Sequence, residues 1–163
     1  MRREVKGYGL LVMGLLMLLT SCSKDTVYSR FVPISYPNGT ITSSGEWAVD
    51  SVASFDYTIT DNSVDYQMVV YVRHTERYPY QNMWLFIGDG QHQDTIEFYL
   101  ADDRGQWLGN KHHGFIEMPV LYETAKHFPD TETYTLTIQH GMRDSLLRGV
   151  MDIGLEIQRN GQD

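Results

Sequence analysis

The sequence predicts an all-β protein, an antiparallel β-sandwich of jelly-roll-like type. Three observations support this fold class. Apolar and polar residues alternate with a period of two in several runs, turn-forming residues separate these runs at roughly ten-residue spacing, and no long amphipathic helical pattern is present. Seven or eight short strands of this kind fill two antiparallel sheets that share one core.

The predicted strands follow in chain order. Five runs alternate so that one face is apolar, and their apolar residues are Phe55, Tyr57 and Ile59; Tyr66, Met68, Val70 and Val72; Ile96, Phe98 and Leu100; Tyr134, Leu136 and Ile138; and Ile153, Leu155 and Ile157. Residues 83–87 are apolar on both faces, which predicts a central strand. The run from Phe115 to Tyr122 contains Pro119, whose missing N–H predicts an edge strand or a bulge.

Turn-forming residues lie between these runs, at Asp61-Asn62-Ser63, Gly88-Asp89-Gly90, Asp103-Arg104-Gly105 and Pro129-Asp130. Two short segments are the helix candidates, Thr124 to His127 and Arg143 to Arg148. No linker rich in proline, glycine or serine divides the chain, so one domain is expected after the N-terminal segment.

The N-terminal segment has the organisation of a secretory signal. Basic residues open it, and residues 8–19 are almost entirely apolar, a run shorter than the roughly 20 residues that a membrane-spanning helix needs. The run ends in Leu19, Thr20, Ser21 and Cys22, the lipobox that lipoprotein signal peptidases recognise. We therefore expect residues 1–21 to be removed and the Cys22 thiol to receive diacylglycerol, with a further acyl chain on its amine.

Cys22 is the single cysteine of the chain, which excludes a disulfide framework and a thiol nucleophile elsewhere. The expected mature protein is an acylated cysteine with a tether, residues 22–26, followed by one sandwich domain, residues 27–163. The signal carries a net charge of +2, so the mature chain has a formal charge of −10. This acidity argues against nucleic acid as a partner and against electrostatic docking on anionic lipid.

The segment from Asp102 to Gly109 allows two interpretations. Asp102 and Asp103 could bind calcium while Trp107 stacks on a sugar, or an aspartate could cap a tight turn in which Gly105 has a positive φ. Calcium needs about six to eight oxygen ligands, and two nearby carboxylates supply too few. The turn is therefore the favoured interpretation, with Trp107 and Leu108 closing the end of the core.

The loop from Arg73 to Trp84 is the best candidate for a contact surface. Aromatic side chains in a loop can bind a glycan or a partner protein, or can simply cover the end of the sandwich. The candidate contact residues are Arg73, Tyr78, Tyr80 and Trp107. The adjacent His112 and His113 would point to opposite faces of a strand, so a shared metal is not expected. No catalytic motif occurs, and neither an enzymatic activity nor a cofactor is expected.

Four stretches together carry a family likeness. They are Arg73 with Tyr78-Pro79-Tyr80-Gln81-Asn82; Asp94-Thr95 through Leu100-Ala101-Asp102; Gly105-Gln106-Trp107-Leu108-Gly109; and Met142-Arg143-Asp144 through Leu147-Arg148-Gly149 to Asp152-Ile153-Gly154-Leu155. In these stretches and in its lipobox the chain resembles the gliding-motility lipoprotein H (GldH) family of the Bacteroidota. The likeness extends from about Trp47 to the end of the chain.

The resemblance implies an envelope lipoprotein that acts in gliding motility and, through it, with type IX secretion. Its expected partners are the membrane, through the lipid anchor, and other envelope proteins of that machinery. Ser23 differs from the aspartate that retains some lipoproteins in the inner membrane, which favours the outer membrane, at its periplasmic face. The alternative hypothesis is a cell-surface glycan-binding lipoprotein of a nutrient-uptake system.

Overall fold

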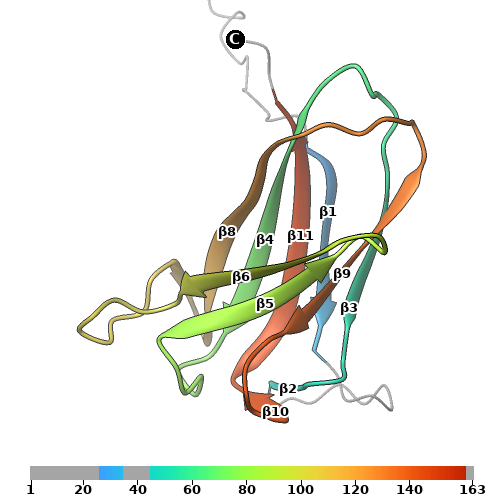
Figure 1. Ribbon diagram of the computed structural model, residues 1–163. Helices are drawn as coiled ribbons and strands as arrows, with labels where there is room; N and C mark the ends of the chain where they lie inside the picture. Colours follow the sequence, from blue (N-terminus) through green and yellow to red (C-terminus); the bar gives the residue numbers. More distant parts are fainter. Residues whose placement is uncertain (1–25, 35–44, 161–163) are drawn as a thin grey trace, which may run out of the picture.

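Two antiparallel sheets pack face to face in the computed structural model, which describes residues 26–34 and 45–160 (Figure 1). The five-stranded sheet contains, in spatial order, β1 (Thr26–Pro33), β11 (Val150–Arg159), β4 (Tyr66–His74), β8 (Phe115–Lys126) and β7 (Asn110–His112). The four-stranded sheet contains β3 (Ala53–Thr58), β9 (Thr133–His140), β5 (Asn82–Gly88) and β6 (Gln93–Tyr99). A short pair, β10 (Leu146–Arg148) and β2 (Glu46–Ala48), lies at one end. The predicted all-β sandwich is confirmed.

The core lies between the two sheets and is built from the inward faces that alternation predicted. Strand β4 shows the pattern most clearly, because every second residue from Tyr66 to His74 is buried and the residues between them are half-buried. Strand β3 alternates fully, with Phe55 buried and its neighbours exposed. Burying such side chains contributes about 1.5–3 kcal/mol each, so the inward faces determine the register of the sheets.

Strand β5 corrects one expectation. It lies between β9 and β6 and is therefore a central strand by pairing, as predicted. Only Met83, Leu85 and Ile87 are buried, however, while Trp84 is 37% exposed and Phe86 is half-buried. Their rings lie on the outer face of the four-stranded sheet, because successive side chains of a strand point to opposite faces. The run of five apolar residues suggested burial on both sides, but no layer covers this outer face in the described part of the chain.

Strand β8 behaves as Pro119 predicted. It pairs with β4 along its length, but β7 covers its other side only at residues 115–117. Pro119 therefore lies where β8 is the edge of the sheet, and the missing N–H disrupts no ladder there. Shifts of register on both sides of Met68 show that the β4–β8 ladder is also bulged.

Both helix candidates are wrong, and the described residues contain no helix. Residues 124–126 end strand β8, where Lys126 pairs with Tyr66, and residues 146–148 form β10 against β2. Such short segments cannot offset the cost of nucleating a helix, whereas an adjacent strand offers ready ladder hydrogen bonds. Within the same residues, no helix is long and apolar enough to cross a membrane.

The two ends of the sandwich differ. Strand β1 begins at Thr26 beside Gln158, and the Asn160 N–H donates to the Asp65 carbonyl at 2.9 Å, so the N-terminal start and the C-terminal stretch share one end (Figure 1). We call this the anchor-side end, after the expected lipid at Cys22. Strands β2 and β10 and the β4–β5 loop lie at the other end.

Candidate functional site

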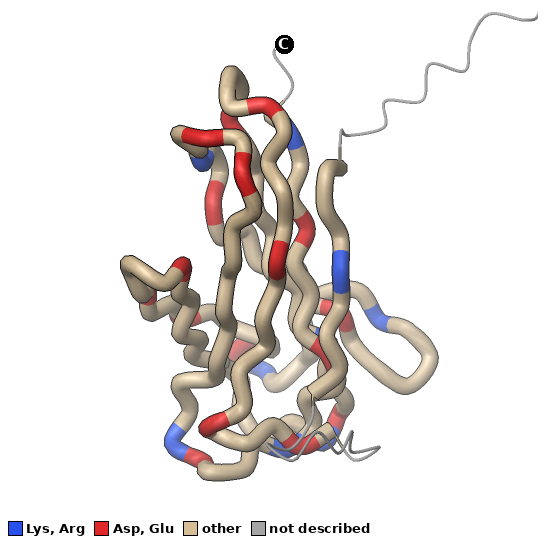
Figure 2. Tube along the Cα trace, turned by 90° about the vertical axis from the view of Figure 1, so that its right-hand side faces the viewer, with Lys and Arg blue, Asp and Glu red and all other residues tan. Residues whose placement is uncertain are grey.

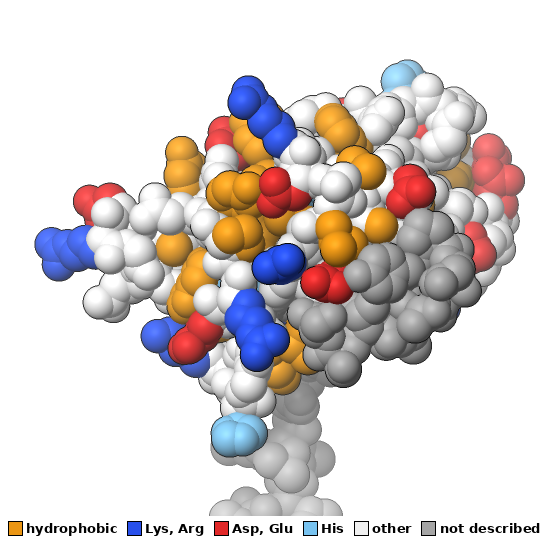
Figure 3. Space-filling model, turned by 90° about the horizontal axis from the view of Figure 1, so that it is seen from below, with side chains coloured by type: hydrophobic (Ala, Val, Ile, Leu, Met, Phe, Trp, Pro, Cys, Tyr) orange, Lys and Arg blue, Asp and Glu red, His pale blue; other side chains and the backbone are white. Residues whose placement is uncertain are grey.

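Segments that are far apart in the sequence meet at the end of the sandwich away from Thr26. The Gln81 carbonyl, in the β4–β5 loop, accepts the N–H groups of Leu100 and Ala101, and the Tyr80 hydroxyl donates to Asp144 Oδ2 at 2.9 Å. Hydrophobic side chains gather on this end among Lys, Arg, Asp and Glu side chains (Figure 3). We call the ring cluster of His74, Tyr78, Tyr80 and Trp107 the aromatic end.

The rings of the aromatic end pack edge to face. The ring centroids of His74 and Trp107 are 4.8 Å apart, and those of Tyr78 and Tyr80 are 6.0 Å apart. Tyr78 is buried and donates its hydroxyl to the Asn82 carbonyl at 2.8 Å, whereas Tyr80 is 37% exposed. The candidate contact residues thus differ in role, because Tyr78 and Trp107 build the core of the cluster while Tyr80 presents a ring to solvent.

Arg73 does not belong to this cluster. Strand alternation directs it to the outer face of the five-stranded sheet, opposite to its neighbour His74. There its guanidinium lies 3.5 Å from the centre of the Phe31 ring and binds Glu117 at 2.8 Å. The sequence analysis therefore grouped Arg73 wrongly with Tyr78, Tyr80 and Trp107, because Arg73 lies on the other face of the sheet. The alternation of β4 could have predicted this, since Arg73 and His74 are neighbours on one strand.

The segment from Asp102 to Gly109 adopts the turn that the sequence favoured. Asp102 Oδ1 accepts the backbone N–H groups of Arg104 and Gln106, at 3.0 and 2.7 Å, and Gly105 has a φ of +77°. Trp107 packs into the aromatic end as expected, but Leu108 is 37% exposed and does not close the core. Across residues 26–34 and 45–160, no three His, Cys, Asp or Glu side chains gather as metal ligands would.

The remaining sequence candidates lie elsewhere. His112 and His113 are exposed, and the His112 ring stacks on Phe115 with centroids 4.8 Å apart. The lipobox residues Leu19, Thr20 and Ser21 and the acylation site Cys22 lie outside the described residues. They stay predictions.

Comparison with known proteins identifies the family. The model of the family described as GldH lipoprotein matches residues 35–157, most of the chain. The chain belongs to the GldH lipoprotein family. A gliding motility lipoprotein GldH homolog of Christiangramia forsetii is 26% identical, over 89% of this chain and 91% of its own length. Gliding motility lipoprotein GldH of Flavobacterium johnsoniae is 25% identical, over 96% of this chain and 98% of its own length.

Among solved structures, dimeric latent PorU from Porphyromonas gingivalis gives a TM-score of only 0.39 at 10% identity. The alignment covers 83% of this chain and 13% of PorU. Such a likeness carries no argument about function.

The GldH-like stretches contribute jointly to the aromatic end. The first stretch supplies the rings of Tyr78 and Tyr80, and the third supplies the ring of Trp107. The fourth supplies two residues that contact these rings: Asp144, which accepts the Tyr80 hydroxyl, and Gly149, which lies against Tyr78. The residues that the sequence reasoning missed here are two histidines with no exposed surface, His74 and His140. The sequence only weakly indicated that these histidines are buried, because each occupies the last inward position of a strand.

Burial lowers the pKa of both histidines below the ordinary value for the side chain. His74 Nδ1 lies 3.1 Å from the Thr75 carbonyl, while its Nε2 has no hydrogen-bond partner, and the His140 ring meets the Trp47 indole edge-on at 5.2 Å. Neutral rings fit such surroundings, since a buried charge without a partner is costly. The two rings therefore serve packing.

This arrangement predicts a pH dependence of stability in this GldH-family protein. The unfolded chain protonates its histidines near pH 6.5 while the buried rings stay neutral, so the unfolded state binds more protons. The free energy of unfolding should therefore fall as the pH drops below about 6.5, by at most about 1.4 kcal/mol per pH unit for each ring. Urea unfolding between pH 7.5 and 5.5 at constant ionic strength measures this slope.

The double variant His74→Gln/His140→Gln tests the assignment, with the exposed His112→Gln as its control. The double variant should flatten the slope whatever its stability at pH 7.5, and the control should keep the slope of the parent protein. An unchanged slope in the double variant would assign the pH dependence to other groups.

Proposed function

We propose that this protein is a non-catalytic, lipid-anchored component of the gliding motility machinery in the cell envelope, linked to type IX secretion. The observation that carries the proposal is the family match over residues 35–157, together with two curated relatives that are named for gliding motility. The aromatic end supports action by contact, because its rings pack against one another and Tyr80 reaches solvent.

The proposed anchor orients the domain relative to the membrane. Cys22 precedes the first residue of β1 by four positions, and four extended residues span at most about 14 Å. The acyl chains would therefore hold the anchor-side end close to the bilayer, with the aromatic end facing away from it. We place the anchor in the outer membrane, with the domain on the periplasmic side.

Charge at the anchor-side end is consistent with attachment through lipid alone. Its loops carry Asp61, Asp65, Asp130 and Glu132, and red segments mark the upper loops in Figure 2. Lys126 and Arg159 also lie at this end, but the four carboxylates outnumber them and repel the anionic surface of a membrane, so this end favours no electrostatic adhesion. Two or more acyl chains, at about 0.8 kcal/mol per buried CH₂, hold such a domain stably.

A complementation experiment tests the proposal. Deleting the gene in its host should abolish colony spreading and lower secretion through the type IX route, and the wild-type gene should restore both. The variant Cys22→Ser should leave the protein out of the membrane fraction and fail to restore spreading, whereas Ser23→Ala should behave as wild type. External protease should degrade the wild-type protein only after the outer membrane is opened.

Two results would contradict the proposal in different ways. Normal spreading and secretion in the deletion strain would remove the motility role. Full rescue by Cys22→Ser would show that the role needs no lipid anchor.

A further inference from the structure

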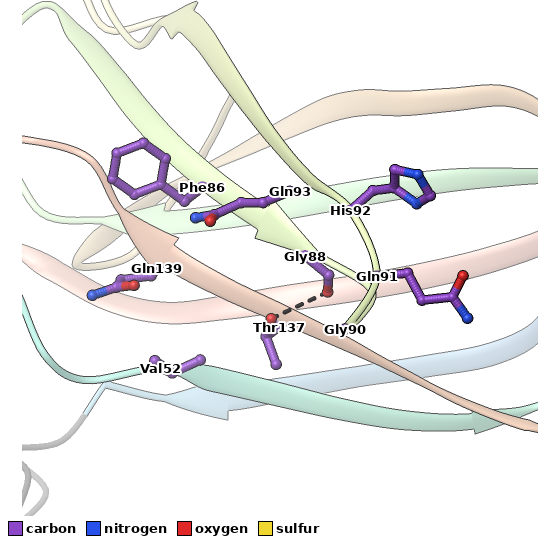
Figure 4. A pocket seen from close by; sticks show the side chains of 9 residues that line it. All are labelled: Val52, Phe86, Gly88, Gly90, Gln91, His92, Gln93, Thr137 and Gln139. Carbon is purple, nitrogen blue, oxygen red and sulfur yellow. Dashed lines mark hydrogen bonds between the residues drawn. The ribbon is translucent and has the colours of Figure 1, made fainter.

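The outer face of the four-stranded sheet carries a hollow that the motility role does not explain. The hollow has a volume of about 400 Å³ and lies over β5, β6 and β9. Its lining combines aliphatic, aromatic, amide and hydroxyl groups, from Val52, Phe86, Gly88, Gly90, Gln91, His92, Gln93, Thr137 and Gln139 (Figure 4). We call it the amide hollow.

The lining contains no Asp, Glu, Lys or Arg, although 21% of the residues of the chain are charged. A charged ligand needs an opposite charge or several charge-assisted hydrogen bonds to replace its hydration. The amide hollow supplies no carboxylate, ammonium or guanidinium group, and His92 is the one titratable side chain of its lining, so its chemistry favours a neutral ligand. Phosphate groups, nucleic acids and acidic peptides are disfavoured on this ground.

The polar groups of the hollow are held in place. The Thr137 hydroxyl donates to the Gly88 carbonyl at 3.1 Å, and the Gln139 amide nitrogen donates to the Val49 carbonyl. This hydrogen bond fixes the orientation of the Gln139 amide group, and its oxygen can still accept a hydrogen bond from a ligand. The side chains of Phe86, Gln93 and Gln139 extend to one side of the view in Figure 4, whereas Gln91 extends to the other.

An amide both donates and accepts hydrogen bonds, which matches the hydroxyl groups of a sugar, and an aromatic ring packs against the apolar face of the sugar ring. Phe86 supplies the ring in the amide hollow. Two residues earlier on the same face, Trp84 lines a second hollow of about 350 Å³, whose lining also includes the cation Arg143. The interval from Asn82 to Gly88 spans about 20 Å of strand, enough for a short oligosaccharide.

Gly141 leaves room on this face for the Phe86 ring and for the base of the Trp84 side chain. A Cβ at this position would lie 3.1 Å from the Phe86 ring and 3.2 Å from Trp84 Cβ. The Gly141 N–H also donates to the Trp84 carbonyl at 2.7 Å, which extends the ladder past the end of β9. Gly141 lines the second hollow and lies against Phe86 of the amide hollow, so the two hollows are neighbours along β5.

We propose that the amide hollow binds a neutral oligosaccharide, with Phe86, Gln93 and Gln139 as its main contacts. The proposal goes beyond the motility role and does not depend on it. It also relocates the glycan-binding idea that the sequence attached to Trp107, because the Trp107 ring packs against His74 and Tyr78. Such a ligand could come from the cell wall or from a neutral polysaccharide.

Binding is tested on the purified full chain by isothermal titration calorimetry with chitotetraose, cellotetraose and mannotetraose. At least one should bind with a dissociation constant below about 1 mM, and the affinity should change little with salt, because the ligand and its main contacts Phe86, Gln93 and Gln139 carry no charge. Tetragalacturonate, which carries a carboxylate on each sugar, should bind at least about 10-fold more weakly. Preference for chitotetraose would point to the acetamido sugars of the cell wall, and preference for the others to a neutral polysaccharide.

Two variants locate the site, and a third is the matched control. Gln93→Ala should weaken binding about 3- to 10-fold by removing one amide, and Phe86→Leu should weaken it by a similar factor. Gln106→Ala removes the same amide from an exposed position in the turn at Asp102, outside the lining of the hollow, and should change the affinity by less than about 2-fold. Gln93 is exposed, so its replacement leaves the core intact.

Three results would overturn the proposal. They are the absence of saturable heat with all three neutral oligosaccharides up to about 10 mM, equal effects of Gln93→Ala and Gln106→Ala, and tighter binding of the charged tetragalacturonate. Each of them leaves the complementation experiment unaffected, so the motility proposal stands or falls separately.

Discussion

Replacing Gly149 with alanine is expected to lower the free energy of unfolding by about 2–5 kcal/mol, the sum of backbone strain and overpacking. Gly149 has a φ of +83°, where an L side chain costs roughly 1–2 kcal/mol. An added Cβ would also lie 2.4 Å from the Tyr78 nitrogen and 2.8 Å from Tyr78 Cα. These are backbone atoms that cannot rotate away, so the contact adds about 1–3 kcal/mol of overpacking.

The clash would also disturb the hydrogen bond from the Thr75 N–H to the Gly149 carbonyl, which measures 2.8 Å and joins the β4–β5 loop to the start of β11. The aromatic end should therefore loosen first. Chemical denaturation, read by far-UV circular dichroism at pH 7.5, measures the loss. If the variant does not fold at all, the same comparison can be made by its yield of soluble protein.

Gly114→Ala is the matched control for this prediction. Gly114 has a similar φ of +93°, but an added Cβ would meet nothing within 4 Å. The control isolates backbone strain and should cost only about 1–2 kcal/mol. Equal losses in the two variants would show that strain, and not the contact with Tyr78, makes glycine necessary at position 149.

Replacing Trp47 with alanine should lower the free energy of unfolding by about 3–5 kcal/mol, the range for truncating a large buried aromatic side chain. Trp47 has no exposed surface, and its indole N–H donates to the Ser51 carbonyl at 2.8 Å. It pairs with Leu147 across the β2–β10 ladder and packs against the His140 ring. Its removal leaves a cavity in the core beside the aromatic end, and the surrounding strands can close that cavity only in part.

The control for this prediction is Trp84→Ala, which removes the same side chain from the outer face of β5. Because Trp84 is 37% exposed, its loss should cost no more than about 1 kcal/mol in urea unfolding at pH 7.5. A loss for Trp47→Ala as small as that for Trp84→Ala would mean that the β2–β10 pair contributes little to the stability of the sandwich.

The sequence identified seven of the strands, five of them by alternation, because such patterns extend over five or more residues. Strands β2, β7 and β10 contain three residues each, too few for a period of two to be recognised. Strand β1 was missed for another reason, since only Tyr28, Phe31 and Val32 of its eight residues are even half-buried and polar residues interrupt them. Its pairing with β11 depends on backbone hydrogen bonds, which any sequence without proline in the interior can make.

The candidate contact surface was only partly predictable. Chain proximity placed Arg73, Tyr78 and Tyr80 in one loop region, and the structure confirms that Tyr78 and Tyr80 pack together. Arg73, in contrast, lies on the outer face of β4, away from the aromatic end, and contacts the Phe31 ring there. Trp84 and Phe86 were expected to be buried, since five consecutive apolar residues do not reveal whether a second layer exists. The amide hollow needs β5, β6 and β9 side by side, and no local pattern specifies that arrangement.

By itself, the sequence determined the fold class, the inward faces of the five alternating strands and the turn at Asp102, because these depend on near neighbours in the chain. It also predicts the lipid anchor at Cys22, a chemical signal that needs no folded partner. Only the tertiary structure decided which outer face stays open and which distant segments meet at the aromatic end. Those outcomes depend on sheet order, which is set by the burial of all inward faces together and not by any one segment.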